Sequence, residues 1–230
     1  NGTAVSATDL TGVGAGNVAF KLLNDVGGTQ QDVAMTTATG SYINSDVDDI
    51  GISGGASFSA GEVIRFDLVN GLTLHEFSGN TPDTFSYDGT HNEVVRWKQS
   101  IVSNPATNEA SIKVTAINAG PETGPDDNTF YDPAFGNDAR VVLTAANVRI
   151  YNASNQLVEP ATYTANGIVV NDAADAYAVN ISGLANGWYY EIVTDDTHKF
   201  DAIQVDALSD TQTFSLGFFT YGTDSAGTPI

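Results

Sequence analysis

The amino-acid sequence predicts an all-β fold, an antiparallel and jelly-roll-like β-sandwich with long loops between its strands. Apolar and polar residues alternate with a period of two over many short runs, which is typical of strands with one buried face. These runs are rich in Val, Ile, Thr, Tyr and Phe, which favour strands, and clusters of Gly, Asn, Asp and Pro separate them. No stretch shows a convincing helical period over three turns.

The expected strands follow one another along the chain. In 62–69, Ile64, Phe66 and Leu68 share one face, as residues two apart on a strand do. The same alternation occurs in 93–102, 110–117, 175–182, 188–193, 200–208 and 213–221. The segment 137–148 is the one candidate helix, but its β-branched residues argue for strand.

The domain organisation is expected to be simple. A chain of 230 residues, 41% of them hydrophobic, can build one large all-β domain or two small ones. Because we find neither an internal repeat nor a linker, we expect one module over 1–230. The alternative divides the chain into two small sandwiches near 118–138. This loop is longer than the usual connection of roughly 2–6 residues. The chain starts within a pattern and ends on "GTDSAGTPI", so we expect a module cut from a longer protein.

The charge balance excludes several classes of partner. Eight basic residues face 28 acidic ones, for a net charge of -20. Nucleic acid and anionic membrane surfaces would repel such a chain, and no apolar run approaches the ~18 residues of a spanning helix, so we expect no membrane insertion. A signal peptide is not recognisable at the start. The charge suits a protein in a salty medium, or one that collects divalent cations.

Cysteine is absent, so disulfides, thiol nucleophiles and thiolate metal sites are not possible. This fits a bacterial surface or secreted protein, although a cytosolic protein could also lack cysteine.

The segment 121–138 contains five acidic residues and no Lys or Arg. Calcium binds roughly six to eight oxygens from carboxylates, Asn side chains, backbone carbonyls and water, and a loop of Asp, Asn, Gly and Pro supplies them. We therefore expect a calcium-binding loop here, with a solvated acidic loop as the alternative. The expected ligands are Asp126, Asp127, Asn128, Asp132, Asn137 and Asp138.

A second acidic cluster contains Asp46, Asp48 and Asp49. Its spacing begins like an EF-hand, but the twelfth position is Ser57 where the EF-hand requires Glu. Calcium would therefore bind there with another geometry, and the alternative is a plain turn between strands. Two weaker candidates are the Asp-rich turns in 170–177 and 193–201.

Catalytic patterns are missing from the sequence. His75, His91 and His198 match no zinc spacing, and no nucleophile elbow, phosphate loop or kinase motif is present. A pair of carboxylates for glycoside hydrolysis leaves no sequence signature, so that chemistry stays open. We expect a binding protein and not an enzyme.

Aromatic residues indicate where a ligand would bind. Phe130, Tyr131 and Phe135 lie among the acids of the long loop, where a cation and aromatic rings together would suit an anionic ligand. In 188–190, three adjacent aromatics must point to both faces of a strand. Tyr189 then lies opposite the core, either as a platform for a sugar or peptide or in ordinary sheet packing.

Two longer blocks carry a resemblance to a known family. "SAGEVIRFDLVNG" (59–71) and "FDAIQVDALSDTQTFSLGFFTYG" (200–222) resemble ligand-binding modules of giant bacterial repeats-in-toxin (RTX) adhesins, above all their calcium-dependent peptide-binding domain. The nonapeptide calcium repeat and the extender-domain calcium motifs of such adhesins are absent.

The resemblance implies an extracellular, monomeric module on the bacterial surface that attaches to cells. It would bind the C-terminal carboxylate of a peptide or protein through a calcium ion in 126–138. Two alternatives stay open: a calcium-assisted carbohydrate-binding module whose ligand is a glycan, and a structural adhesin spacer that calcium stiffens.

Overall fold

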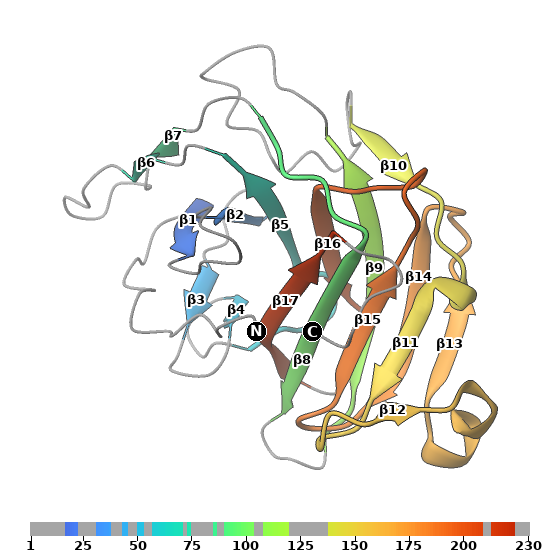
Figure 1. The fold of residues 1–230 in the computed structure, drawn as a ribbon. Helices are drawn as coiled ribbons and strands as arrows, with labels where there is room; N and C mark the ends of the chain where they lie inside the picture. The colour runs from blue at the N-terminus through green and yellow to red at the C-terminus, as the bar shows by residue number, and fades with distance from the viewer. Residues whose placement is uncertain are drawn as a thin grey trace.

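Two antiparallel sheets lie face to face and form the β-sandwich that the alternating sequence predicts (Figure 1). The structure is a computed structural model. It describes residues 17–22, 31–37, 43–45, 50–52, 57–70, 73–74, 85–86, 90–103, 108–119, 138–208 and 213–223.

The first sheet has eight strands within these residues. Its path runs through β1 (Asn17–Leu22), β2 (Gln31–Thr37), β5 (Val63–Val69), β16 (Ala202–Ala207), β9 (Ala110–Asn118), β14 (Ala178–Leu184) and β13 (Val169–Asp172). Its eighth strand, β10 (Ala139–Val141), pairs with the end of β9.

The second sheet has seven strands within the same ranges and faces the viewer in Figure 1. Its order is β12 (Leu157–Val158), β11 (Val148–Tyr151), β15 (Tyr189–Val193), β8 (Arg96–Ser103), β17 (Phe214–Gly222), β4 (Ile50–Ile52) and β3 (Ile43–Ser45). A separate pair joins β6 (Thr73–Leu74) to β7 (Phe85–Ser86).

The long strands alternate between the sheets. From β5 onward, β8, β9, β11, β14, β15, β16 and β17 belong in turn to the second and the first sheet. The connections therefore cross the sandwich, as in jelly-roll-like folds. Because β16 pairs with both β5 and β9, strands from either side of 118–138 share one sheet, and the described strands do not divide into two sandwiches there.

The core lies between the sheets. Ile64, Phe66 and Leu68 of β5 are buried, as their alternation predicts. Phe66 contacts the second sheet, where its ring centroid is 5.1 Å from that of Trp97. Trp97 in turn stacks on Phe219 at 4.5 Å, with 12° between the ring planes. Burial of each such side chain contributes roughly 1.5–3 kcal/mol, so these contacts hold the two layers together.

The segment 137–148 contains no α-helix in its described part. It forms β10, a short 3-10 turn (Ala145–Asn147) and the first residue of β11, in accord with its β-branched composition. Two further 3-10 turns, Pro160–Thr162 and Thr164–Asn166, connect β12 to β13. Among the residues that the structure describes, no helix has the length and hydropathy to cross a membrane.

Candidate functional site

Most of the residues proposed for binding lie outside the described ranges, and their roles stay predictions. These are Asp126, Asp127, Asn128, Asp132 and Asn137, the aromatics Phe130, Tyr131 and Phe135, and the second cluster Asp46, Asp48 and Asp49. The structure does describe Asp138 and Tyr189, which lie on different sheets of the sandwich. It also describes Ala119, so the residues on both sides of 120–137 are placed.

Asp138, at the C-terminal end of the acidic segment, is fixed to the outer face of the first sheet. Its Oδ2 lies 2.5 Å from Nη1 of Arg65, and both side chains are buried, at 8% and 1% exposure. Arg65 lies within β5 and points away from the core, because Ile64 and Phe66 take the core face. Arg65 thus binds one carboxylate oxygen of Asp138. If Asp138 is a calcium ligand, as predicted, it binds the ion through its other oxygen.

Arg65 also binds Asp67, two residues along the same face of β5. The distance from Nη2 of Arg65 to Oδ1 of Asp67 is 2.7 Å, and Nε of Arg65 donates to both oxygens of Asp67 at 2.9 and 3.1 Å. The pKa of Asp67 is raised to about 7, chiefly by burial and to a smaller extent by Asp201 and Asp138, while Arg65 opposes the shift. One guanidinium is therefore shared within a predominantly acidic cluster.

Asp201 fixes the other end of the acidic segment. It is buried directly before β16, and its Oδ1 accepts a hydrogen bond from the backbone N–H of Ala119 at 2.8 Å. Its Oδ2 lies 3.9 Å from Nδ1 of His91. Ala119 is the last described residue before 120–137 and Asp138 is the first after it. Charged side chains on the outer face of one sheet therefore hold both ends of the segment.

We call Arg65, Asp67, Asp138, Asp201 and His91 the anchor cluster. Its members do not form a metal centre by themselves, because the described residues contain no group of three or more His, Cys, Asp or Glu side chains that could hold a metal ion. The cluster can position the acidic segment and make its surroundings more negative, and both effects would favour a cation in that segment.

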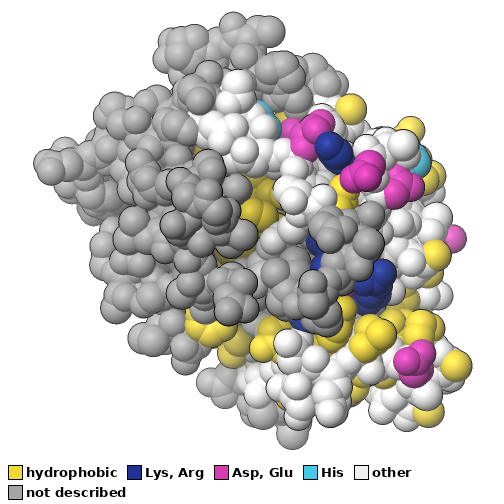
Figure 2. Space-filling model, in the orientation of Figure 1, with side chains coloured by type: hydrophobic (Ala, Val, Ile, Leu, Met, Phe, Trp, Pro, Cys, Tyr) yellow, Lys and Arg dark blue, Asp and Glu magenta, His cyan; other side chains and the backbone are white. Residues whose placement is uncertain are grey.

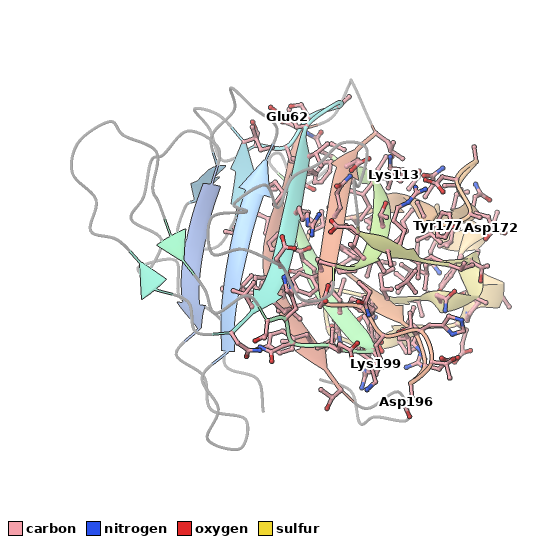
Figure 3. All side chains as sticks on the ribbon, turned by 90° about the horizontal axis from the view of Figure 1, so that it is seen from above. Glu62, Lys113, Asp172, Tyr177, Asp196 and Lys199 are labelled. Atoms are coloured by element: carbon pink, nitrogen blue, oxygen red, sulfur yellow. The ribbon has the colours of Figure 1, made fainter. Side chains whose placement is uncertain are left out.

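The two weaker Asp-rich turns use their carboxylates locally. Oδ1 of Asp175 accepts from the backbone N–H of Tyr177 at 3.1 Å, and Oδ1 of Asp195 accepts from that of Thr197 at 2.9 Å. Hydrogen bonds from Thr197 and His198 lower the pKa of Asp195 to about 2. Asp172 and Asp196 lie far apart in Figure 3, so the turns do not combine into one site. These contacts are typical of turns without metal.

Tyr189 lies on the outward face of β15, as its position between Trp188 and Tyr190 predicts. Tyr190 takes the core face, where its hydroxyl donates to Oε1 of Gln99 at 2.6 Å. Tyr189 is partly exposed, and Nζ of Lys98 lies 5.4 Å from its ring centroid. The tyrosine is thus part of a cation–π contact as well as a possible platform.

The sequence reasoning missed a buried ionic network beside Tyr189. Glu191 has no exposed surface and accepts from Nε of Arg96 at 2.8 Å and from the hydroxyl of Tyr151 at 2.7 Å. Arg149 approaches the same carboxylate at 3.8 Å. Figure 2 shows Lys and Arg side chains gathered on this sheet, which faces the viewer there. The sequence does place opposite charges on the outward faces of neighbouring strands, which was the available signal. Nothing in the sequence indicates that these charges are buried.

Comparisons with models of known protein families, with curated proteins and with solved structures give no match.

Proposed function

We propose that this chain is an extracellular ligand-binding module of a bacterial surface adhesin. It holds a calcium ion in the acidic segment 121–138, and the ion binds the C-terminal carboxylate of a peptide or protein on a target cell. The observation that carries the proposal is the attachment of both ends of the segment, Ala119 through Asp201 and Asp138 through Arg65. A loop fixed at both ends loses less entropy when its oxygens converge on an ion.

Electrostatics gives the ion its role. With a net charge of -20, the protein repels a carboxylate ligand. The anchor cluster adds to this effect, because three buried aspartates are accompanied by a single arginine and His91. A bound calcium ion would be the largest local charge and would reverse the sign of the field that the ligand meets.

The module binds its ligand without turning it over. Phe130, Tyr131 and Phe135 are proposed to contact the last side chains of the peptide, while the ion holds the terminal carboxylate. The described edge strands β12 and β13 offer backbone groups for pairing with an extended chain, although the proposal does not depend on this.

A matched pair of peptides tests the function. One peptide has a free C-terminal carboxylate and the other is amidated, and each is titrated into the protein in calcium and again in chelator. We expect binding of the free peptide in calcium only, and amidation should remove most of it. Hits on a glycan array, with neither peptide bound, would favour the carbohydrate-binding alternative. Equal binding of both peptides would refute the ion bridge, and no ligand of either kind would favour the spacer.

A further inference from the structure

Lys98 is an unusual lysine, because its ammonium group is buried against the outer face of the second sheet. The residue lies in β8, the middle strand of that sheet, and its side chain is only 3% exposed. Nζ lies 3.6 Å from the ring centroid of Tyr151 and 5.4 Å from that of Tyr189. Burial lowers the pKa of Lys98 and Arg96 lowers it further, while Glu191 opposes the shift. More of the amine is therefore neutral, and so nucleophilic, than for a lysine in water.

The group that this amine meets is the side-chain amide of Asn155. Nζ of Lys98 lies 2.5 Å from Oδ1 of Asn155. A C=O bond is ~1.2 Å long, so Nζ lies no more than about 3.7 Å from the carbonyl carbon. Reacting atoms in a near-attack arrangement are roughly 3–3.5 Å apart. The amine and the amide carbon are thus close to the separation from which a bond forms.

The backbone holds Asn155 in this position. Its φ is 59°, the only positive value among the described residues other than glycine. The turn is fixed by Asn152, whose carbonyl accepts from the N–H of Asn155 at 2.8 Å and whose Oδ1 accepts from the N–H groups of Ser154 and Gln156 at 3.0 Å. Such a pre-ordered turn lowers the entropic cost of a reaction between its side chain and the sheet.

An acid–base group lies beside the pair. Glu191 is directly opposite Lys98 in the antiparallel pairing of β15 with β8, so the two side chains share one face. The hydroxyl of Tyr151, whose ring contacts Nζ, donates to Oε2 of Glu191 at 2.7 Å. This arrangement supplies a buried carboxylate on the same face, which can accept a proton from Nζ and return it through a bridging water.

We propose that Lys98 and Asn155 react to form an intramolecular amide bond that ties β8 to the turn between β11 and β12. Nζ of Lys98 first loses one proton to solvent, and the neutral amine attacks Cγ of Asn155 while Glu191 accepts the second proton that Nζ gives up. The bond between Cγ and Nδ2 then breaks, and Nδ2 leaves as ammonia after it receives the proton from Glu191. One N–C bond forms, one breaks and one ammonia is lost, so the step needs neither oxidant nor cofactor.

The cross-link would stabilise this chain in the way that a disulfide stabilises secreted proteins. It joins residues 57 positions apart in a chain that has no cysteine. A covalent link of this kind restricts the unfolded chain and resists both proteolysis and pulling force. The inference concerns the second sheet alone and does not depend on calcium or on a peptide ligand.

Intact-mass spectrometry of the purified full chain tests the proposal. We expect a mass lower than that of the sequence by one ammonia, and a tryptic digest should contain one branched peptide that includes both Lys98 and Asn155. Trypsin should also fail to cleave after Lys98. The variants Lys98→Arg and Asn155→Ala should each restore the full sequence mass. In Asn155→Asp, the same linkage would form with loss of water instead of ammonia.

The outcomes separate a cross-link from a hydrogen bond. Lys98→Arg keeps the charge of the unreacted lysine but cannot form the amide, so a circular dichroism spectrum like that of the wild type would show that folding does not require the cross-link. Glu191→Gln should lower the cross-linked fraction. If this buried variant fails to fold, the mass of Lys98→Arg still decides whether the cross-link forms through Lys98. A folded wild-type protein that keeps its full sequence mass after incubation at mildly alkaline pH would overturn the proposal.

Discussion

A few buried charged residues determine how the outer faces of this sandwich are built. Arg65 is the clearest case, because its guanidinium contacts Asp67 and Asp138 while it is itself only 1% exposed. The free energy of such an arrangement depends on every charge having a partner. Removal of the one cation would leave the carboxylates buried without compensation.

Arg65→Leu should therefore lower the free energy of unfolding by about 3–5 kcal/mol at neutral pH, the usual loss when one partner of a buried ion pair is removed. Urea unfolding measures the change. Lys199→Ala is the matched control, because Lys199 and Glu93 are 3.7 Å apart and 39% and 49% exposed. It should cost less than ~1 kcal/mol. Similar small losses for both variants would show that the anchor cluster contributes little to stability.

The raised pKa of Asp67 predicts a pH dependence of defined sign. Its pKa is about 7 in the folded protein against an ordinary value of 3.8, so the folded state binds the proton more tightly than the unfolded state. The contribution of Asp67 to stability is complete below pH ~4 and is lost as the pH rises through about 7. The free energy of unfolding should fall by up to ~1.4 kcal/mol per pH unit across this window from this residue alone.

Asp67→Asn should remove that slope, because the amide does not titrate. Urea unfolding at several pH values between 4 and 8 compares the variant with the wild type. Asp195 has a pKa lowered to about 2, so its contribution is lost only as the pH falls below ~4, and it does not disturb the window. A wild-type slope that persists unchanged in Asp67→Asn would contradict the assignment to this carboxylate.

At the scale of the elements, the sequence predicted the strands well, but it predicted the contacts on the outer faces of the sheets poorly. Alternation identified β5, β8, β9, β15, β16 and β17, because an apolar residue at every second position is a local signal. The same alternation leaves Arg65 on the face opposite Ile64 and Phe66, but the burial of Arg65 and Arg96 depends on partners 73 and 95 residues away. No local pattern predicts such contacts, and the segment that carries most of the candidate ligands lies outside the described residues.

Glycine at the irregularity of β14 gives a test of local backbone geometry. The pairing of β14 with β9 changes register between Ser182 and Leu184, and Gly183 there has a φ of +79°. A Cβ at this position would lie 2.2 Å from the backbone oxygen of Gly167. Gly183→Ala should therefore destabilise the protein both through the left-handed backbone and through a clash with atoms that cannot move freely.

The control for this variant is Gly61→Ala. Gly61 has a φ of +81°, but a Cβ there meets nothing within 4 Å. Its cost should be the backbone contribution alone, about 1–2 kcal/mol. Urea unfolding of both variants should show a clearly larger loss for Gly183→Ala. Equal losses would mean that the backbone at Gly167 moves aside without cost.

At the scale of the whole molecule, charge dominates. The chain combines a net charge of -20, no cysteine and an acidic segment without Lys or Arg. Repulsion among so many carboxylates destabilises a compact state, and the anchor cluster concentrates some of them at the ends of that segment. A divalent cation that binds only the folded protein would offset this repulsion, which is the central claim of the proposed function.

Thermal unfolding in calcium and in chelator tests that claim most directly. At a calcium concentration a hundredfold above the dissociation constant, one site adds roughly 2.7 kcal/mol, so the melting temperature should rise reversibly by several degrees. Magnesium should have a smaller effect, because it prefers a tight octahedral shell. A variant that combines Asp126→Asn, Asp127→Asn and Asp132→Asn should lose the calcium response. Identical wild-type melting curves in calcium and in chelator would contradict the account.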